Sequence, residues 1–330
     1  MRANVIAQMS ENCAARSFTR EYVRALYDKP LLPLIDEARR THLLHHPDNE
    51  VELCTLLSVK TGGCSENCGY CSQSNHHETK VNAEKIADLD EVMGSARRAK
   101  EIGTTRLCMG VAWREAKDGP AFDRILTMVS RVKELGLETC LTAGMLTYAQ
   151  AMRLKEAGLD MYNHNLDTSR EHYPSIVSTR SYDDRLRTLA TLREAGIKAC
   201  SGGIIGMGES AGDRCEMLRT LANLDPPPES VPINALVPVE GTPLEHMPPV
   251  DPLDLVRTIA VARILMPKAR VRLSAGRSSL SREAQLMCML AGANSIFFGD
   301  KLLTTPNSNE SDDLDLLRAA GLKAMTQPAL

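Results

Sequence analysis

The sequence predicts one α/β domain folded as a TIM-type (β/α)8 barrel, and three observations lead to this expectation. Short apolar runs alternate with longer segments in which apolar residues recur every three or four positions. A glycine follows four of the longer segments just before the next apolar run, as is common at helix ends, at Gly103, Gly136, Gly158 and Gly196. The repeat occurs eight times from about residue 52, which is enough to close a barrel. An open doubly wound sheet is the alternative.

Each predicted strand is a short, mostly apolar run, as expected for strands buried on both faces of a parallel sheet. The eight runs are Glu52–Lys60, Arg106–Val111, Glu138–Ala143, Asp160–Leu166, Lys198–Ile205, Ser230–Val237, Arg270–Gly276 and Ser295–Gly299. The segments between them are amphipathic. In the predicted helix Tyr182–Ala195, for example, Leu186, Leu189 and Leu192 share one face.

No stretch rich in polar residues divides the repeats into two domains. We therefore expect an N-terminal helical extension over residues 1–50, a single barrel over 51–300, and a C-terminal region over 301–330 that holds a loop and a short helix at Leu314–Ala320. The proline-rich stretches Asp225–Pro232 and Pro238–Pro252 are interpreted as long loops at the two ends of one strand.

The composition is that of an ordinary globular protein, with 43% hydrophobic and 25% charged residues and a formal net charge of -3. This balance gives no electrostatic reason to expect nucleic acid or an anionic membrane as a partner. No apolar run reaches the roughly 18 to 20 residues that span a bilayer. The N-terminus has no apolar stretch typical of a secretory signal, and Glu11 and Glu21 interrupt the arginines that would indicate a mitochondrial transit peptide. We expect a cytoplasmic protein whose ten cysteines are thiols, metal ligands or nucleophiles rather than disulfides.

Only one group of cysteines is closely spaced. Cys64, Cys68 and Cys71 form a C-x3-C-x2-C pattern in a glycine-rich loop that follows the first predicted strand, and barrel enzymes place their chemistry at that end of the strands. Three thiolates are one fewer than the usual four ligands of a [4Fe–4S] cluster, which would leave one iron open to a small molecule. A zinc site with His76 or His77 as a fourth ligand is the competing interpretation, although structural zinc ligands usually come as two paired motifs.

The same loop resembles the cluster loop of radical S-adenosylmethionine enzymes, because an aromatic residue, Tyr70, precedes the last cysteine. The resemblance implies that S-adenosylmethionine fills the open iron position. It also implies that an electron from the cluster cleaves the sulfonium to methionine and a 5′-deoxyadenosyl radical.

Four further residues are placed by strand parity. Cys108, Cys140 and Cys200 lie in the second, third and fifth predicted strands, and each alone could be a small buried hydrophobe. Arg272 lies mid-strand between two apolar residues that can pack against helices, so its side chain is expected to face the barrel interior. A charge buried there needs a partner. Three thiols and one guanidinium facing one interior suggest a second metal centre.

Polar side chains also occur among the apolar residues of the fourth and sixth predicted strands. Asn163, Asn165 and Asp167 alternate along the fourth predicted strand and so share a face, and Asn234 stands among apolar residues in the sixth. Such groups can recognise ureas, carboxylates or ribose hydroxyls. A polar network that only fixes the barrel is the alternative.

Taken together, these positions resemble the biotin synthase family over nearly the whole chain, from about residue 28 to 325. The matching segments are the cysteine triplet, Cys108-Met109-Gly110, residues 162–168 (YNHNLDT), Cys200-Ser201-Gly202-Gly203, Pro232-Ile233-Asn234, residues 272–277 (RLSAGR) and residues 292–299 (GANSIFFG).

The resemblance implies the following roles. Cys64, Cys68 and Cys71 hold a [4Fe–4S] cluster, and Cys108, Cys140, Cys200 and the unusual ligand Arg272 hold a [2Fe–2S] cluster; the triplet and Arg272 count as catalytic. Asn163, Asn165 and Asn234 contact the substrate, while Asn165, Asp167 and the motif containing Gly202, Ile204 and Glu209 contact S-adenosylmethionine.

The implied reaction is the last step of biotin biosynthesis. The substrate is dethiobiotin, and the internal cluster gives up a sulfide that replaces two unactivated C–H bonds with C–S bonds. Flavodoxin or ferredoxin would supply electrons, the iron–sulfur assembly machinery would rebuild the consumed cluster, and a homodimer is expected.

Two departures from the family pattern and two rival functions remain. Ser72 stands where many relatives have proline, and the C-terminus is short beside some members. The rivals are a radical enzyme that rearranges or methylates its substrate, and a non-catalytic iron–sulfur carrier or zinc-stabilised protein. The other cysteines are interpreted as ordinary thiols, at Cys13, Cys54, Cys215 and Cys288.

Overall fold

A closed parallel barrel forms the centre of the computed structural model, which describes residues 17–299 and 301–326. The ring consists of β1 (Glu50–Lys60), β2 (Arg106–Val111), β3 (Glu138–Thr142), β4 (Met161–Asn163), β5 (Lys198–Cys200), β7 (Ser230–Ala235), β8 (Arg270–Leu273) and β9 (Ser295–Phe297). All neighbours pair in parallel, and β9 pairs back to β1 through Glu52 and Ser295. This closure confirms the predicted (β/α)8 barrel and excludes the open sheet.

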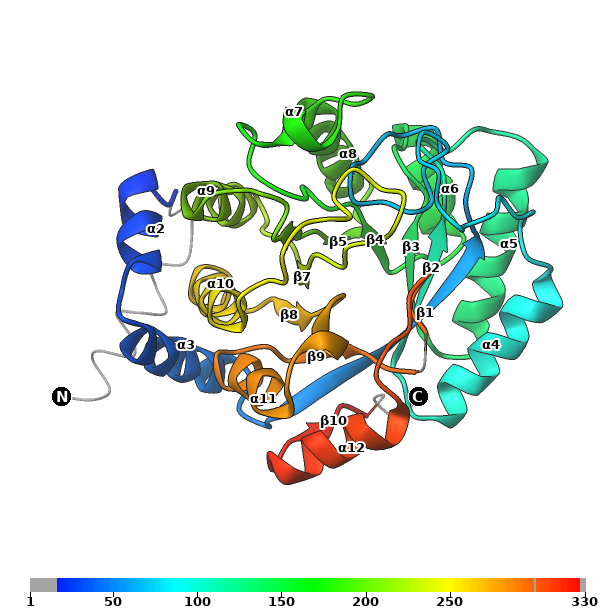
Figure 1. The fold of residues 1–330 in the computed structure, drawn as a ribbon. Helices are drawn as coiled ribbons and strands as arrows, with labels where there is room; N and C mark the ends of the chain where they lie inside the picture. The colour runs from blue at the N-terminus through cyan, green and yellow to red at the C-terminus, as the bar shows by residue number, and fades with distance from the viewer. Residues whose placement is uncertain (1–16, 300, 327–330) are drawn as a thin grey trace.

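Helices surround the ring, as Figure 1 shows. They are α4 (Leu89–Glu101), α5 (Pro120–Glu134), α6 (Tyr148–Glu156), α7 (Tyr173–Ile176), α8 (Tyr182–Glu194), α9 (Ala211–Ala222), α10 (Pro252–Leu265) and α11 (Arg282–Leu290), with a short 3-10 turn, η1, at Arg277–Ser279. The four predicted helix-ending glycines all have positive φ angles, between 68° and 91°. Side-chain caps start several helices: Ser181, for example, accepts a hydrogen bond from the backbone N–H of Asp184 at the start of α8.

The fifth predicted strand is in fact two pieces, β5 and β6 (Gly203–Ile205). Pro232, on the neighbouring strand β7, has no N–H to donate. The row of hydrogen bonds between the two strands is therefore interrupted at this residue. A Cβ at Gly202 would collide with the carbonyl of Pro232, so only glycine allows the two backbones to approach this closely.

The other strand boundaries differ from the prediction mainly at their ends. Strand β4 stops at Asn163 instead of Leu166, and Asp167 lies beyond it with a φ angle of 68°. A two-residue strand that was not predicted, β10 (Lys323–Ala324), pairs with the start of β1. Helix α12 (Glu310–Ala319) starts four residues earlier than expected, because the Asn309 side chain accepts a hydrogen bond from the N–H of Asp312.

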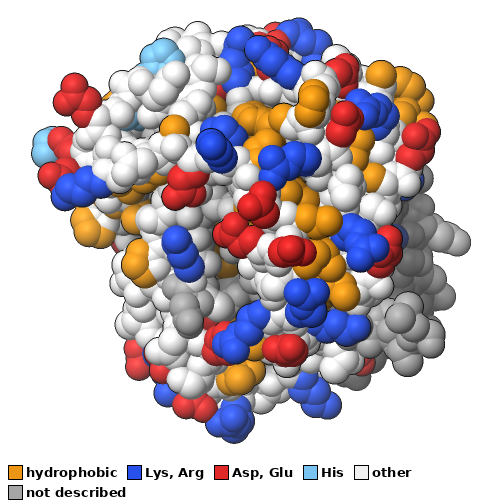
Figure 2. All heavy atoms as spheres, turned by 90° about the vertical axis from the view of Figure 1, so that its right-hand side faces the viewer, with side chains coloured by type: hydrophobic (Ala, Val, Ile, Leu, Met, Phe, Trp, Pro, Cys, Tyr) orange, Lys and Arg blue, Asp and Glu red, His pale blue; other side chains and the backbone are white. Residues whose placement is uncertain are grey.

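Two helices of the expected N-terminal extension are described, α2 (Arg20–Tyr27) and α3 (Leu31–His45), and they pack against α9 and α10. Predictions about residues 1–16, including Cys13 and most of the arginine-rich start, fall outside the described residues. Within residues 17–299 and 301–326, no helix is both long and apolar enough to cross a membrane. Figure 2 shows one face of the molecule, on which basic and acidic side chains are interspersed.

Candidate active site

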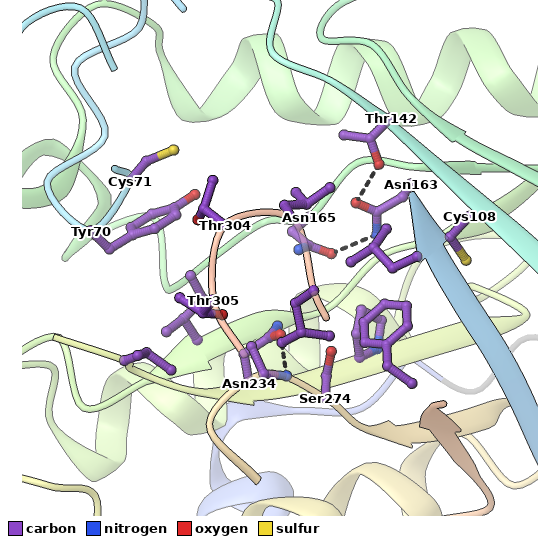
Figure 3. Close-up of a pocket in the computed structure, with 18 of the residues that line it drawn as sticks. Tyr70, Cys71, Cys108, Thr142, Asn163, Asn165, Asn234, Ser274, Thr304 and Thr305 are labelled. Carbon is purple, nitrogen blue, oxygen red and sulfur yellow. Dashed lines mark hydrogen bonds between the residues drawn. The ribbon is translucent and has the colours of Figure 1, made fainter. Parts of the chain in front are cut away.

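A cavity of about 270 Å³ opens where the strands end. Figure 3 shows Tyr70 and Cys71 of the cysteine loop at one side of this cavity and Cys108 of β2 at the other. Leu56, Ile204 and other apolar side chains line it, together with the amides that strand parity had pointed to. Cys71 of the predicted loop therefore meets Cys108, Cys140 and Arg272 at one cavity. Cys64, Cys68 and Cys200 are not part of the lining of this cavity.

The cysteine loop leaves β1 and is fixed by its own backbone. The N–H of Cys64 donates to the carbonyl of Gln73 at 2.9 Å, and the N–H of Cys71 donates to the carbonyl of Cys68 at 2.9 Å. Burial raises the pKa of Cys68 to about 11 and that of Cys71 to about 12. Without a bound cation these two side chains are therefore neutral thiols, and a metal must displace their protons.

Residues just after α7 hold the loop from outside. The Asn67 side chain accepts hydrogen bonds from the N–H groups of Ser178 and Thr179, at 3.0 and 3.2 Å. Glu66 is buried, accepts a hydrogen bond from the hydroxyl of Thr179 and pairs with Arg114 at 3.2 Å. These contacts position the loop before any ligand is present.

The zinc alternative is not supported. The Nε2 atom of His76 lies 3.2 Å from the carbonyl oxygen of Ser65, and that of His77 lies 2.9 Å from the carbonyl oxygen of Cys68. Both rings therefore already have a backbone hydrogen-bond partner at this nitrogen. Within the described part of the chain, no three His, Cys, Asp or Glu side chains are arranged to hold a single metal ion. A four-iron cluster is several ångströms across, and its thiolates lie farther apart than the ligands of one ion, so this arrangement does not conflict with a cluster.

Beside the loop lies a buried charged group. The hydroxyl of Tyr70 donates to Asp167 at 2.9 Å, and Arg185 on α8 donates to the same carboxylate oxygen. Burial lowers the pKa of Arg185, but the carboxylate of Asp167 together with Tyr70, Tyr173 and Cys68 outweighs it and raises that pKa well above its ordinary value. Arg185 was not among the predicted site residues, because its only signal in the sequence is a charge beside the apolar face of its helix.

Four thiols gather inside the barrel, where three had been predicted. Cys54, Cys108, Cys140 and Cys200 are each at most 5% exposed and pack together around Met161, apart from the main hydrophobic core. Cys108 and Cys140 are direct partners in the β2–β3 register. Hydrogen bonds from Cys140 and Cys54 lower the pKa of Cys108, and one from Cys140 lowers the pKa of Cys200 to about 6.

Arg272 lies in the same interior, as its strand position predicted, and is 1% exposed. Its Nε donates to Ser295 at 2.9 Å, and its Nη2 lies 3.1 Å from the Cys54 sulfur and 3.4 Å from Glu52. Burial lowers the pKa of Arg272, but the thiols and Glu52 outweigh it and raise that pKa well above its ordinary value.

Glu52 is the carboxylate that the predicted buried arginine required. It is 1% exposed and pairs with both Arg272 and Arg106, the latter at 2.7 Å. Burial raises the pKa of Glu52, but the two arginines outweigh it and bring that pKa to about 2. The signal for this pairing was a glutamate at the start of an apolar run, which the sequence analysis did not use.

The amides form a chain of hydrogen bonds along the cavity. Thr142 donates to Asn163, whose Nδ2 donates to Asn165 at 3.2 Å and lies 3.3 Å from the sulfur of Cys200. Asn234, on the opposite wall, donates to the carbonyl of Gly203 at 2.9 Å. Asn163, Asn165 and Asn234 line the cavity, while Asp167 lies behind it with Arg185.

The residues of the predicted S-adenosylmethionine motif lie in different surroundings. Ile204 lines the cavity, and the N–H of Gly202 donates to Asn165 at 3.1 Å. Glu209 lies outside the cavity lining: its carboxylate accepts from the N–H groups of Gly206 and Met207 and pairs with Arg214 at 2.7 Å. Its visible role is to hold the turn between β6 and α9.

The loop that follows β9 covers the cavity. Leu302, Leu303, Thr304 and Thr305 line it, and the hydroxyl of Thr304 lies 3.0 Å from that of Ser72, next to the last cysteine of the triplet. A Cβ at Gly110 would lie 2.6 Å from a methyl carbon of Leu303, so the Leu303 side chain reaches down to β2.

The donor sets fit iron–sulfur chemistry. Three thiols in a loop with one ligand missing suit a [4Fe–4S] cluster with an open iron, and a closed group of interior thiols beside a cation suits a second, smaller cluster.

Comparisons with known proteins agree with this geometry. Residues 58–221 match the model of the Radical SAM superfamily, and residues 232–323 match that of the Biotin and Thiamin Synthesis associated domain. The solved structure of methylornithine synthase is similar with a TM-score of 0.79 and 21% identity, covering 95% of this chain and 96% of that one. A maturase of the [FeFe]-hydrogenase is similar with a TM-score of 0.79 and 19% identity, covering 93% and 72%. At these identities the likeness shows the fold alone.

Other proteins are much more similar to this chain in sequence than these two solved structures are. The "Biotin synthase" of Sorangium cellulosum (strain So ce56) is 65% identical over 305 residues, which cover 92% of this chain and 87% of that protein. The "Biotin synthase" of Myxococcus xanthus (strain DK1622) is 59% identical over 303 residues, covering 92% and 88%. With most residues identical over nearly the full length of these relatives, the chain belongs to the biotin synthase family of radical S-adenosylmethionine enzymes.

Proposed function

We propose that this enzyme converts dethiobiotin to biotin by inserting sulfur at two unactivated carbons. The observation that carries the proposal is one cavity with a three-cysteine loop at one side and interior thiols at the other. As a radical S-adenosylmethionine enzyme it uses a [4Fe–4S] cluster and S-adenosylmethionine.

Cys64, Cys68 and Cys71 would hold the four-iron cluster, which when bound supplies the electron that splits S-adenosylmethionine. Tyr70 and the Arg185–Asp167 pair would hold the loop rigid beside it, because the Asp167 carboxylate joins the loop to helix α8. Asn165, Asp167, Gly202, Ile204 and Glu209 are the proposed contacts or supports for S-adenosylmethionine. Glu209 would act through the turn it holds.

Cys108, Cys140, Cys200 and Arg272 would hold a [2Fe–2S] cluster, which when bound supplies the sulfur. The charge balance supports this assignment, since Arg272 and Arg106 face the thiols and would stabilise an anionic group. The depth of the site supports it too, because these thiols are buried and exclude water from the reacting atoms.

Dethiobiotin would lie between the two groups, with Asn163, Asn165 and Asn234 binding its urea and carboxylate by hydrogen bonds. The amides already bond to one another and to backbone, so their orientations are set before the substrate arrives. Apolar side chains such as Leu56 and Leu303 would contact its hydrocarbon part.

The remaining assignments concern the setting of the enzyme. We propose a cytoplasmic homodimer that takes electrons from flavodoxin or ferredoxin and has its two-iron cluster rebuilt by the iron–sulfur assembly machinery. The division into an extension (1–50), a barrel (51–300) and a C-terminal region (301–330) describes how the chain would be organised.

One anaerobic assay tests the function. After reconstitution with iron and sulfide, the protein should contain roughly six irons per chain, from one four-iron and one two-iron cluster. Mixed with dethiobiotin, S-adenosylmethionine and a reducing system, it should form biotin and two molecules of 5′-deoxyadenosine per biotin, measured by mass spectrometry. Cleavage of S-adenosylmethionine with a rearranged or methylated product would overturn the proposal, and so would zinc as the only bound metal.

A further inference from the structure

Cys54 is a fourth thiol at the proposed two-iron site. It is fully buried and packs with Cys108, Cys140 and Cys200. The other two described cysteines without an assigned role, Cys215 and Cys288, lie instead among the apolar side chains of the main core. All three are predicted from the sequence to be ordinary thiols, whereas the structure separates Cys54 from Cys215 and Cys288.

The strand register explains why Cys54 faces inward. It follows Glu52 by two residues on β1, so both side chains point to the same face, and Glu52 points at the interior arginines. Two residues further on, Leu56 is the register partner of Cys108. Cys54 therefore lies one inward-facing position nearer the start of the strands than Cys108 and Cys140.

Cys54 and Arg272 are in direct contact within this site. The Cys54 sulfur lies 3.1 Å from Arg272 Nη2 and 3.8 Å from the hydroxyl of Ser295. Arg272 in turn is held by Ser295 at 2.9 Å and by Glu52 at 3.4 Å. Any iron within reach of the guanidinium nitrogen is close to this sulfur as well.

Arg272 and Cys54 differ in how well their side chains can bind iron. A guanidinium offers five N–H donors and no lone pair of its own, whereas a cysteine thiolate is the standard ligand of a [2Fe–2S] cluster. With Cys54 included, the interior provides the usual four thiolates.

We propose that Cys54 is a second ligand for the fourth position of the two-iron cluster, which it fills in exchange with Arg272. On exchange the thiol proton of Cys54 passes to the guanidine nitrogen that leaves the iron, an Fe–S bond replaces an Fe–N bond, and no electron is transferred. The displaced guanidinium stays beside the thiolates, paired with Glu52. This inference rests on the proposed two-iron site.

Mössbauer and resonance Raman spectra of four full-length variants test it: Arg272→Met, Cys54→Ala, Arg272→Met with Cys54→Ala, and Arg272→Met with Cys288→Ala. Each is reconstituted anaerobically with iron and sulfide, and circular dichroism confirms its fold. The last variant is the matched control, since Cys288 is an equally buried thiol away from the site. Arg272→Lys replaces Arg272→Met throughout if the latter does not fold.

Arg272→Met and its Cys288→Ala control should keep a two-iron cluster with the spectrum of four thiolate ligands. Adding Cys54→Ala should remove that spectrum or lower the iron content by two per chain, while Cys54→Ala alone keeps the cluster through Arg272. The exchange is refuted if Arg272→Met loses the cluster, or if Cys54→Ala leaves the Arg272→Met spectrum unchanged. A wild-type protein without any two-iron signal refutes the proposed site itself, and the inference with it.

Discussion

Arg185 and Asp167 form a buried ion pair beside the cysteine loop, with side chains that are only 7% and 2% exposed. Arg185 comes from helix α8 and Asp167 from the turn after β4, so the pair joins the outer layer to the barrel. The hydroxyl of Tyr70 donates to the same carboxylate and brings the cysteine loop into this contact.

Asp167→Asn should therefore be among the more destabilising single changes near the site. It leaves the Arg185 guanidinium buried without its carboxylate, and breaking a buried pair in this way costs about 3 to 5 kcal/mol. Denaturant unfolding of the metal-free protein measures the loss. Tyr70→Phe is the control, because it removes one hydrogen bond to Asp167 and should cost about 1 kcal/mol. Equal stability of Asp167→Asn and wild type would show that the pair is not structurally important.

Replacing Cys71 by alanine should abolish the four-iron cluster. The reconstituted protein should retain roughly two irons per chain instead of six, and cleavage of S-adenosylmethionine should fall below detection. Iron analysis and the release of methionine measure the two effects. Cys215→Ala, a buried thiol in the main core, should keep both clusters. Full iron content in Cys71→Ala would remove the triplet from the assignment.

Replacing Cys140 by alanine should separate the two halves of the reaction. Cys140 contacts the thiols of Cys108 and Cys200, so its loss removes the central ligand of the proposed two-iron site. Radical generation uses the other cluster, and we expect 5′-deoxyadenosine to form while biotin does not. Biotin formation at the wild-type rate in Cys140→Ala would contradict sulfur donation from this site.

Acid should weaken the fold through two histidines at the C-terminal end of helix α3. Burial, followed by the charge of Arg263, lowers the pKa of His42 to about 3 and that of His46 to about 4. The unfolded chain takes up these protons near a pKa of 6.5 while the folded protein does not, so stability present above that pH is lost as the pH falls towards 4.

His42→Gln should remove part of this acid sensitivity. Between neutral pH and about pH 5, the free energy of unfolding of the variant should fall by about 2 kcal/mol less than that of wild type. Urea unfolding at a series of pH values measures the difference. His246→Gln, at a side chain that is 92% exposed, should follow the wild-type curve. Parallel curves for His42→Gln and wild type would mean that His42 is charged in the folded state.

The sequence alone predicts the barrel and most of the interior residues, because these follow from local rules. Strand parity alone turns Arg272 inward, and the apolar runs define where strands lie. It did not separate Cys54 from Cys215, because that distinction depends on which strands become neighbours when the barrel closes. It also missed Arg185, whose long side chain crosses from a helix to the end of a strand. The break between β5 and β6 arises from a proline on a neighbouring strand, which no local pattern reveals.

The loop after β9 contacts both ends of the cavity. Leu303 extends from this loop to β2 beside Cys108, and Thr304 meets Ser72 next to the cysteine triplet. Because this one loop lines the cavity at both of its ends, a change in its conformation would alter the shape of the cavity beside Cys108 and beside the cysteine triplet at the same time.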